Sequence, residues 1–281
     1  MISVVIAAHN EAAVIGRCLD SLLADATPGE FDVTVAANGC TDSTAQVAAD
    51  HGVRVVELAE PRKPGALNAG DAVAVGFPRV YLDADIVLST AGLRALAAAT
   101  GGSFLAATAR RELDLTGRPL LVRAYFAIHR RLPTFRTGLF GRGVIVLAEA
   151  GRARFERFPD LVSDDLFLDS LFTVDEKQEV YAVHAVIATP RRTSHLVRRL
   201  ARVRGGNAQM RSAAARGEVS TVVRPVDRFA WLKDVVLRRP WLAPAAVCYV
   251  GITVCAAMLA RIRRERSWAR DDSSREEKAH V

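Results

Sequence analysis

The stretch Val80-Tyr81-Leu82-Asp83-Ala84-Asp85 joins a short apolar run to two carboxylates. Such a run is typical of a buried strand, and ligands of open parallel sheets gather at the carboxyl ends of the strands. Two carboxylates there form a site of hard oxygen ligands, which suits Mg²⁺ or Mn²⁺ bridging to the phosphates of a nucleotide. Asp-x-Asp is also common in surface turns, so its meaning depends on the segments around it.

The first hundred residues alternate strands and helices with short connections, a pattern typical of a parallel sheet in an α/β fold. The expected strands are Ser3–Ala8, Asp32–Ala37, Val53–Leu58 and Val80–Leu82. Between them we expect a helix capped by Asn10, a helix that is capped by Thr41 or Asp42 and ends at Gly52, and a short helix over Ala66–Ala74.

Beyond residue 100 the pattern is less regular. We expect strands at Phe104–Thr108 and Val144–Leu147, and helices at Pro119–Arg131 and Asp164–Phe172. The segment His195–Ala215 predicts a strongly basic amphipathic helix.

Length and composition indicate one large domain, or one domain with an appendage, because half of the 281 residues are apolar. Met1 leads directly into a strand, so we expect no signal peptide. The four cysteines (Cys18, Cys40, Cys248 and Cys255) lack metal-binding spacing, which favours reduced thiols in the cytosol or the membrane.

The net charge of +7 is unevenly distributed. Residues 1–100 carry six Lys or Arg against twelve Asp or Glu, a charge of −6, so the remainder carries +13. A basic half can indicate nucleic acid binding, but aromatic residues are few there and the arginines flank an apolar segment. An anionic membrane surface is therefore the favoured partner, and nucleic acid is not expected.

The flanked segment is Pro240–Ala260, which contains 21 residues without a charge. A helix of that length reaches roughly 30 Å, enough to span a bilayer core. Arginines and tryptophans at both ends (Arg238, Arg239, Arg261, Arg263, Arg264, Trp241 and Trp268) favour a membrane interface. Pro240 and Pro244 permit a kinked or re-entrant segment, and a buried C-terminal helix is the alternative, so the sequence leaves open whether the segment spans the bilayer.

Four segments, each at an expected strand end or just after one, complete the pattern around the carboxylate pair. They are SVVIAAHNE (3–11), VAANGCTDST (35–44), KPGALN (63–68) and DAD (83–85). In this order they resemble the motifs of the family 2 glycosyltransferases, over about residues 2–205 and most strongly over 2–85. The resemblance implies the GT-A nucleotide-diphospho-sugar transferase fold, a mostly parallel central sheet flanked by helices, here followed by an apolar C-terminal helix.

The resulting domain scheme is as follows. Residues 1–215 form the GT-A catalytic domain, 1–100 its nucleotide-sugar-binding half and 101–215 its acceptor half, followed by a linker (216–239), a membrane-associated or transmembrane helix (240–260) and a basic and polar tail (261–281). The tail resembles one found in membrane-associated bacterial members of the family.

The resemblance also implies a donor site. The Ala8 backbone, Glu11 and Asn38 would face the base and ribose, Lys63 would neutralise the diphosphate, and Asn68 lies in a donor-binding segment. Asp85 would hold the Mg²⁺ or Mn²⁺ ion directly, while Asp83 would face the ribose or a metal-bound water. From the residues alone, Glu11 can equally be a first-turn acid, Lys63 a solvated loop lysine and Asp42 a helix cap.

Three departures from the family pattern bear on specificity. The second strand usually ends in an aspartate that accepts from a uracil imide, whereas this chain has Asn38, whose amide can donate as well as accept. The usual tyrosine of the first loop is His9, which either stacks on a base or packs without a chemical role. The Gln-x-x-Arg-Trp motif of processive synthases is absent from the sequence, so we do not predict a polymerase.

The segment FPDLVSDDL (158–166) resembles the family's Glu-Asp-x-x-Leu segment, in which the second acid deprotonates the acceptor hydroxyl. The resemblance assigns the catalytic base to Asp165 and leaves Asp164 as its support or as a helix cap. A carboxylate suits this task because the hydroxyl loses its proton only as the new bond forms. The alternative is that both acids cap the helix; Gly138–Gly143, just upstream, would form a flexible wall of the acceptor pocket.

The sequence thus predicts an inverting, metal-dependent glycosyltransferase that moves a sugar from a nucleotide-diphosphate donor to a saccharide or lipid-linked acceptor. We expect it at the cell membrane with its catalytic domain in the cytoplasm. The alternative is a non-catalytic, membrane-anchored nucleotide-sugar-binding scaffold. A nucleotidyltransferase or a dehydrogenase is disfavoured because no glycine-rich loop follows the first strand. The sequence identifies neither sugar nor acceptor.

Overall fold

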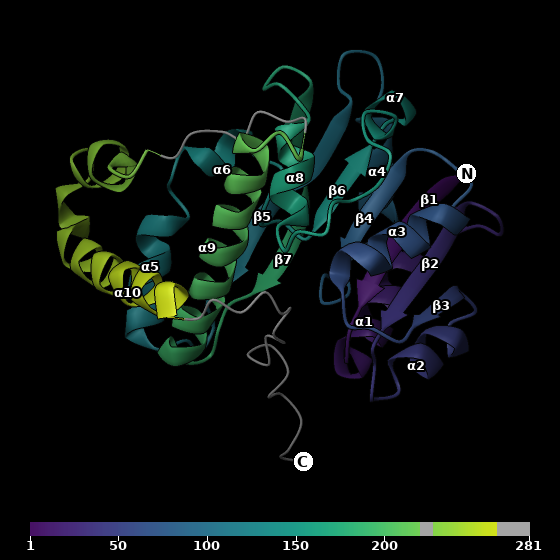
Figure 1. The fold of residues 1–281 in the computed structure, drawn as a ribbon, viewed down its shortest axis with the longest axis horizontal. Helices are drawn as coiled ribbons and strands as arrows, with labels where there is room; N and C mark the ends of the chain where they lie inside the picture. The colour runs from purple at the N-terminus through teal and green to yellow at the C-terminus, as the bar shows by residue number, and fades with distance from the viewer. Residues whose placement is uncertain (220–226, 263–281) are drawn as a thin grey trace. The chain divides into compact units, whose positions relative to one another are not determined.

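The computed structural model describes residues 1–219 and 227–262, and it contains a seven-stranded sheet with the order β3-β2-β1-β4-β6-β5-β7 (Figure 1). The strands are β1 (Ile2–Ala8), β2 (Phe31–Asn38), β3 (Arg54–Leu58), β4 (Arg79–Asp83), β5 (Ala106–Asp114), β6 (Val144–Leu147) and β7 (Lys177–Ala188). The first four strands are parallel, and β6 runs antiparallel to β4 and β5. The predicted α/β class and mostly parallel sheet are confirmed.

The strand register brings distant parts of the sequence to one edge of the sheet. Ala8 pairs with Ala37 of β2, and Ala7 pairs with Asp83 of β4. The interior residues of these strands are buried on both faces, as their continuous apolar runs predict. A slip by one residue would place a polar strand end inside the core, so the apolar runs fix where the strands end.

Helices of the first hundred residues follow the predicted order. They are α1 (Ala12–Leu23), α2 (Thr44–Asp50), α3 (Lys63–Val73) and α4 (Thr90–Ala98). In α1 the buried side chains recur at helical spacing, and α3 begins three residues earlier than predicted because Pro64 fits a first helical turn. Asn10 does not cap α1: it adopts a left-handed conformation with φ of 54°, and its Oδ1 accepts from Thr41 N at 2.7 Å.

The second half of the sheet contains the largest difference from the sequence-based prediction. β7 is a twelve-residue strand in a segment for which the sequence predicted no element. Its first residue, Lys177, is buried and donates from Nζ to Asp169 Oδ1 at 2.6 Å. The start of this strand could not be recognised from the sequence, because a lysine is buried in the core only when it has a partner. Here the partner of Lys177 lies in α8 (Asp164–Ser170). The short helix α7 (Glu149–Arg152) follows β6.

The chain forms two compact units. The first unit comprises Met1–Glu112 and Leu139–Ile187, and the second comprises Leu113–Gly138 and the chain from Ala188 onward. The predicted scheme instead assigned residues 1–215 to one catalytic domain. The difference arises because α5 (Leu120–His129) and α9 (Thr193–Ala215) share a hydrophobic core with α10 (Ala243–Ile262).

The described residues of the second unit are helical apart from strand ends and connecting segments. Besides α5, α9 and α10 it contains the short helices α6 (Thr134–Thr137), η1 (Trp231–Val236) and η2 (Pro240–Leu242). Its cores join Val122, Tyr125, Phe126, Leu196 and Ile252 in one cluster, and Ile128, Val235 and Ala246 in another. η1 lies within the predicted linker 216–239, and the predicted tail lies outside the described residues from 263 onward.

A buried ion cluster fixes the end of α3 to β4. Asp71 Oδ1 accepts from the Arg79 guanidinium and, at 3.1 Å, from the Tyr81 hydroxyl, while its Oδ2 accepts from Arg152 Nε at 2.6 Å. The side chains of Asp71 and Arg79 are 4% and 6% exposed. Burial, and then the Asp71 carboxylate, raise the pKa of Tyr81, so its hydroxyl stays protonated and donates.

We predict that Asp71→Ala lowers the free energy of unfolding by about 3–5 kcal/mol, because it leaves the buried Arg79 guanidinium without its counter-charge. Urea unfolding of the full chain, followed by circular dichroism, measures this. Asp20→Ala is the control: Asp20 is 74% exposed and pairs with His51, so its loss should cost less than about 1 kcal/mol. Equal effects of the two substitutions would contradict the prediction.

Candidate active site

Lys63 connects two carboxylates at the edge where the parallel strands end. Its Nζ lies 2.8 Å from Asp83 Oδ1 and 3.0 Å from Asp164 Oδ2, at the end of β4 and the start of α8 respectively. The Lys63 side chain is only 21% exposed. Burial lowers the pKa of Lys63, but the Asp164 and Asp83 carboxylates outweigh it and raise the pKa above its ordinary value. The ammonium is therefore a permanent positive charge within an acidic cluster.

Asp165 follows at the first turn of α8 and has a different environment. Its Oδ2 accepts from Gly141 N at 2.9 Å, and its Oδ1 accepts from Leu166 N at 2.7 Å. Burial, and then the neighbouring Asp164 carboxylate, raise the pKa of Asp165 to about 6. Burial likewise raises the pKa of Asp164, although Lys63 opposes this. Asp165 is thus a carboxylate that is ionised at neutral pH yet retains affinity for a proton.

The two predicted metal ligands project from the end of β4. Asp83 is 45% exposed on its side chain, and Asp85 is half-buried two residues later. Burial, and then the charges of Asp85 and Asp83, raise the pKa of Cys18 to about 12, so this thiol lies near both carboxylates and stays protonated.

The donor set suits a hard divalent cation. Within residues 1–219 and 227–262, no group of three or more His, Cys, Asp or Glu residues is arranged to hold a metal ion. Asp83 and Asp85 supply carboxylate oxygens only, as Mg²⁺ or Mn²⁺ prefers when phosphate oxygens and water complete its coordination. The residues present therefore fit an ion that arrives together with a phosphorylated ligand.

Gly143 keeps the approach to Asp83 open. Its backbone carbonyl accepts from Asp83 N at 2.8 Å. Its φ is 72°, and a Cβ at this position would lie 2.3 Å from Ile86 Cγ1 and 3.4 Å from Asp83 Oδ2. The positive φ and the closeness of Ile86 both favour glycine at this position. The Gly138–Gly143 segment was predicted as a flexible wall, and here it contributes the Gly141 N–H bound to Asp165 and this close approach.

Asn38, predicted to face a base, is fully buried at the end of β2. Its Nδ2 donates to Ala8 O at 2.7 Å, which joins the ends of β1 and β2. Its Oδ1 is buried and has no hydrogen-bond partner among the described residues. His9 donates from its ring Nδ1 to the Asn38 carbonyl oxygen at 2.7 Å, which holds the histidine against the second strand.

Glu11 and Asp42 lie where two helices begin. Glu11 is the N-cap residue of α1, and its backbone N donates to Thr44 Oγ1 at 2.8 Å. Asp42 accepts from Thr44 N at 3.1 Å and from Ala12 N at 3.2 Å, the first residues of α2 and α1. The N-cap residue of α2 is Ser43, not Asp42 or Thr41 as expected. The contact of Asp42 with Ala12 N joins the loops that follow β1 and β2.

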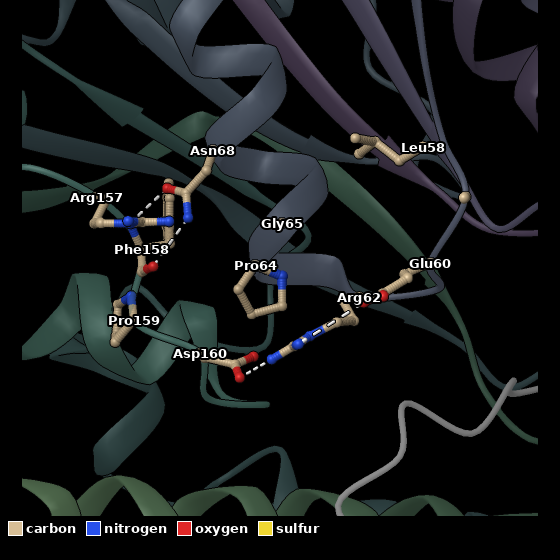
Figure 2. A pocket seen from close by; sticks show the side chains of 11 residues that line it. Leu58, Glu60, Arg62, Pro64, Gly65, Asn68, Arg157, Phe158, Pro159 and Asp160 are labelled. Carbon is tan, nitrogen blue, oxygen red and sulfur yellow. Dashed lines mark hydrogen bonds and ion pairs between the residues drawn. The ribbon is translucent and has the colours of Figure 1, made fainter.

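Asn68, predicted to bind the donor, instead holds a backbone segment. Its Oδ1 accepts from Phe158 N at 2.7 Å, and its Nδ2 donates to Phe158 O at 3.0 Å (Figure 2). The side-chain amide of Asn68 thereby satisfies the backbone N–H and C=O of the buried Phe158. Because Phe158 begins the segment that leads to Asp164 and Asp165, Asn68 fixes the path of the chain toward these acids.

An open groove of about 670 Å³ is lined by Asn68, Phe158 and their neighbours. Figure 2 shows Arg62, at the start of α3, directed toward Asp160, with which it forms an ion pair. Pro64, Gly65 and Pro159 also line the groove. The pairing of Arg62 with Asp160 and of Lys63 with Asp164 was not predicted from the sequence. The complementary charges of 62–63 and 160–165 were visible, but nothing local specifies which acid meets which base.

Comparisons with known proteins agree with this geometry. Residues 3–141 match the family model described as glycosyl transferase family 2. A search of the curated proteins found no match. Among solved structures, a mannosyltransferase from Pyrobaculum calidifontis, in complex with GDP-Man and Mn²⁺, is 21% identical with a TM-score of 0.61. The match covers 92% of this chain and 78% of that one.

A second solved structure is glucosyl-3-phosphoglycerate synthase from Mycobacterium tuberculosis, in complex with Mn²⁺, UDP and glucosyl-3-phosphoglycerate. It is 22% identical with a TM-score of 0.53, and the match covers 70% of this chain and 75% of that one. At such identities the likeness concerns the fold, and it confirms the predicted GT-A architecture.

We predict that Asn68→Ala lowers the free energy of unfolding by about 1–3 kcal/mol, because the backbone N–H and C=O of the buried Phe158 lose their partner. Chemical denaturation measures this, and hydrogen exchange should become faster at residues 157–160. Gln46→Ala is the control, since it removes an exposed amide bonded to Asp50 and should change stability by less than about 0.5 kcal/mol. Unchanged exchange at 157–160 would show that Asn68 does not hold this segment.

Proposed function

This chain belongs, over residues 3–141, to glycosyl transferase family 2, and from that premise we propose that it is an inverting, metal-dependent transferase. It moves a sugar from a nucleotide-diphosphate donor to an acceptor hydroxyl. The observation that carries this proposal is the acidic cluster around Lys63. The Lys63 ammonium pairs with Asp83, from the donor-binding half, and with Asp164, which is next to Asp165 in the sequence. One edge of the sheet thus offers both a cation site and a base.

Asp165 is the proposed base. Its two oxygens each accept one backbone N–H, which fixes the carboxylate while leaving lone pairs for a hydroxyl proton. As the acceptor oxygen attacks the anomeric carbon in line, its proton moves to Asp165 and the bond from that carbon to the diphosphate breaks. A single displacement inverts the anomeric configuration, and no covalent sugar–enzyme intermediate is required.

Asp85 and Asp83 are the proposed holders of the cation, with Asp85 in direct contact. When bound, Mg²⁺ or Mn²⁺ would neutralise the charge that develops on the leaving diphosphate. The Mn²⁺ ions in the Pyrobaculum and Mycobacterium complexes support this choice of ion. Lys63 adds a fixed positive charge at the same edge and orients Asp164, so Asp164 supports the base rather than sharing its role.

The donor's nucleoside is proposed to lie over the ends of β1 and β2, against the Ala8 backbone, Glu11 and Asn38. Asn38 Oδ1 is a buried acceptor without a hydrogen-bond partner among the described residues, which supports a place for Asn38 in this site. Asn68 belongs to this site as a positioning residue, since both ends of its amide are bound to Phe158.

We further propose that the enzyme works at the cell membrane with its catalytic unit in the cytoplasm, on a saccharide or lipid-linked acceptor. Among the described residues, Pro240–Ile262 is the one helical segment long and apolar enough to cross a membrane, and only 22% of its apolar window is buried. A core helix would be mostly buried, so this segment favours contact with lipid.

We predict that Asp165→Asn retains donor binding but lowers the rate of transfer by about 10²–10⁴-fold, because an amide cannot take the acceptor's proton. Binding of the nucleotide by calorimetry and release of nucleoside diphosphate with acceptor present measure the two properties. Asp175→Asn, an exposed acid of the same unit, is the control and should leave both unchanged. More than about a tenth of the activity remaining in Asp165→Asn would remove Asp165 from this role.

The pKa of about 6 for Asp165 predicts a pH dependence. Below that pH the carboxylate is protonated, so kcat/KM should fall about tenfold per pH unit, while above it the rate should level off. Because the folded pKa exceeds the unfolded one, stability relative to Asp165→Asn should decrease as pH rises from about 4 through 6. Rate profiles and urea unfolding across this range test both signs; a rate independent of pH between about 5 and 7 would contradict the assignment.

A further inference from the structure

The helix α10 has two faces of opposite exposure. Ala246, Ile252 and Ala256 are buried along one side. On the other side a stripe runs the length of the helix, in which Val247 is 74% and Ile262 79% exposed. The further exposed residues of the stripe are Pro244, Gly251, Val254, Cys255 and Met258. An uninterrupted apolar stripe of this length is not a usual feature of a surface in contact with water.

The buried side of α10 packs on helices that carry charges. α10 contacts both α9 and α5, and its Tyr249 stacks on Tyr125 with ring centroids 5.1 Å apart. Arginines are distributed over these two neighbouring helices: Arg123 on α5, and Arg198, Arg199, Arg202, Arg204 and Arg211 on α9. Arginines are therefore present on the helices that contact α10 as well as at the two ends of α10.

One of these arginines acts on Tyr249, in the first half of α10. Burial is the main influence on Tyr249 and raises the pKa of its phenol, while the Arg204 guanidinium works in the opposite direction. A positive charge thus lies near a residue in the first half of the helix, well inside the segment that would have to cross a bilayer. Charged side chains at such a depth are strongly unfavourable.

We infer that α10 lies in the plane of an anionic membrane surface, with its apolar stripe inserted at the acyl boundary, and does not span the bilayer. This inference rests on the proposed membrane association and specifies its geometry. A spanning α10 would carry α9 and α5 with their arginines into hydrocarbon, whereas an in-plane helix leaves them at the level of the headgroups. Arg238, Arg239 and Arg261 at its ends match phospholipids of negative charge.

The depth of three labelled positions tests this geometry. In the full chain, with its four native cysteines replaced by alanine, single cysteines at Val247, Val254 or Ile262 are labelled with an environment-sensitive fluorophore. Vesicles of phosphatidylcholine with about one third phosphatidylglycerol carry nitroxide quenchers at shallow or deep acyl positions. An in-plane helix predicts equal and shallow depths for all three labels. A spanning helix predicts Val254 near the centre and Ile262 about 12 Å away along the helix axis.

A paired substitution tests whether the stripe itself binds lipid. Val247→Asp combined with Val254→Asp should weaken sedimentation with the same vesicles about tenfold or more, since both side chains leave the acyl boundary. Val174→Asp, which alters an exposed valine of the first unit, should not. Neither variant touches the acidic cluster, so donor turnover measured without vesicles should stay at the level of the unmodified chain.

Three results would overturn the inference. They are a Val254 label deeper than that at Ile262, an absence of any response of the labels to vesicles, and a solution dimer that the paired substitution dissociates. The first would make α10 a spanning helix, the second would remove lipid as the partner, and the third would assign the stripe to a second copy of the chain. If the labels are shallow but the unmodified chain has no transferase activity, only the proposed reaction is contradicted.

Discussion

The Lys63 ammonium between Asp83 and Asp164 is the interaction on which the rest of the site depends. Without a cation among them, the carboxylates at the end of β4 and the start of α8 would repel one another at the same edge of the sheet. Lys63 is placed there because α3 begins at this residue. One side chain thus joins the half of the sheet that is proposed to hold the donor to the helix that is proposed to supply the base.

The start of α3 supports this junction in two further ways. Arg62 pairs with Asp160, but both side chains are more than half exposed, so this pair contributes little to stability. Asn68 contributes more, because its amide satisfies both backbone groups of the buried Phe158. Together these contacts set the course of residues 158–164, which explains how an element far along the chain reaches the strand ends with its acids in place.

Local sequence patterns were sufficient for the parts of the fold that depend on local physics. Continuous apolar runs identified the four parallel strands, and the carboxylate pair lies at the carboxyl end of β4 as predicted, with Asp83 as its last residue and Asp85 two residues beyond. Properties set by distant partners could not be predicted. The sequence showed Asn68 within a motif, but not that its amide faces Phe158, and a strand beginning with a buried lysine, as β7 does, has no recognisable apolar pattern. The faces of α10 likewise depend on α5 and α9.

Thermal unfolding of the solubilised protein shows whether the carboxylates at the end of β4 form the donor site. The protein is heated with UDP, GDP or dTDP, each with and without Mn²⁺, because a ligand that binds only the folded state raises its stability. We expect a Mn²⁺-dependent rise in Tm with one nucleotide, which would also identify the donor's base, and loss of that rise in Asp85→Ala. No rise with any of the three nucleotides, or a rise that persists in Asp85→Ala, would contradict this expectation.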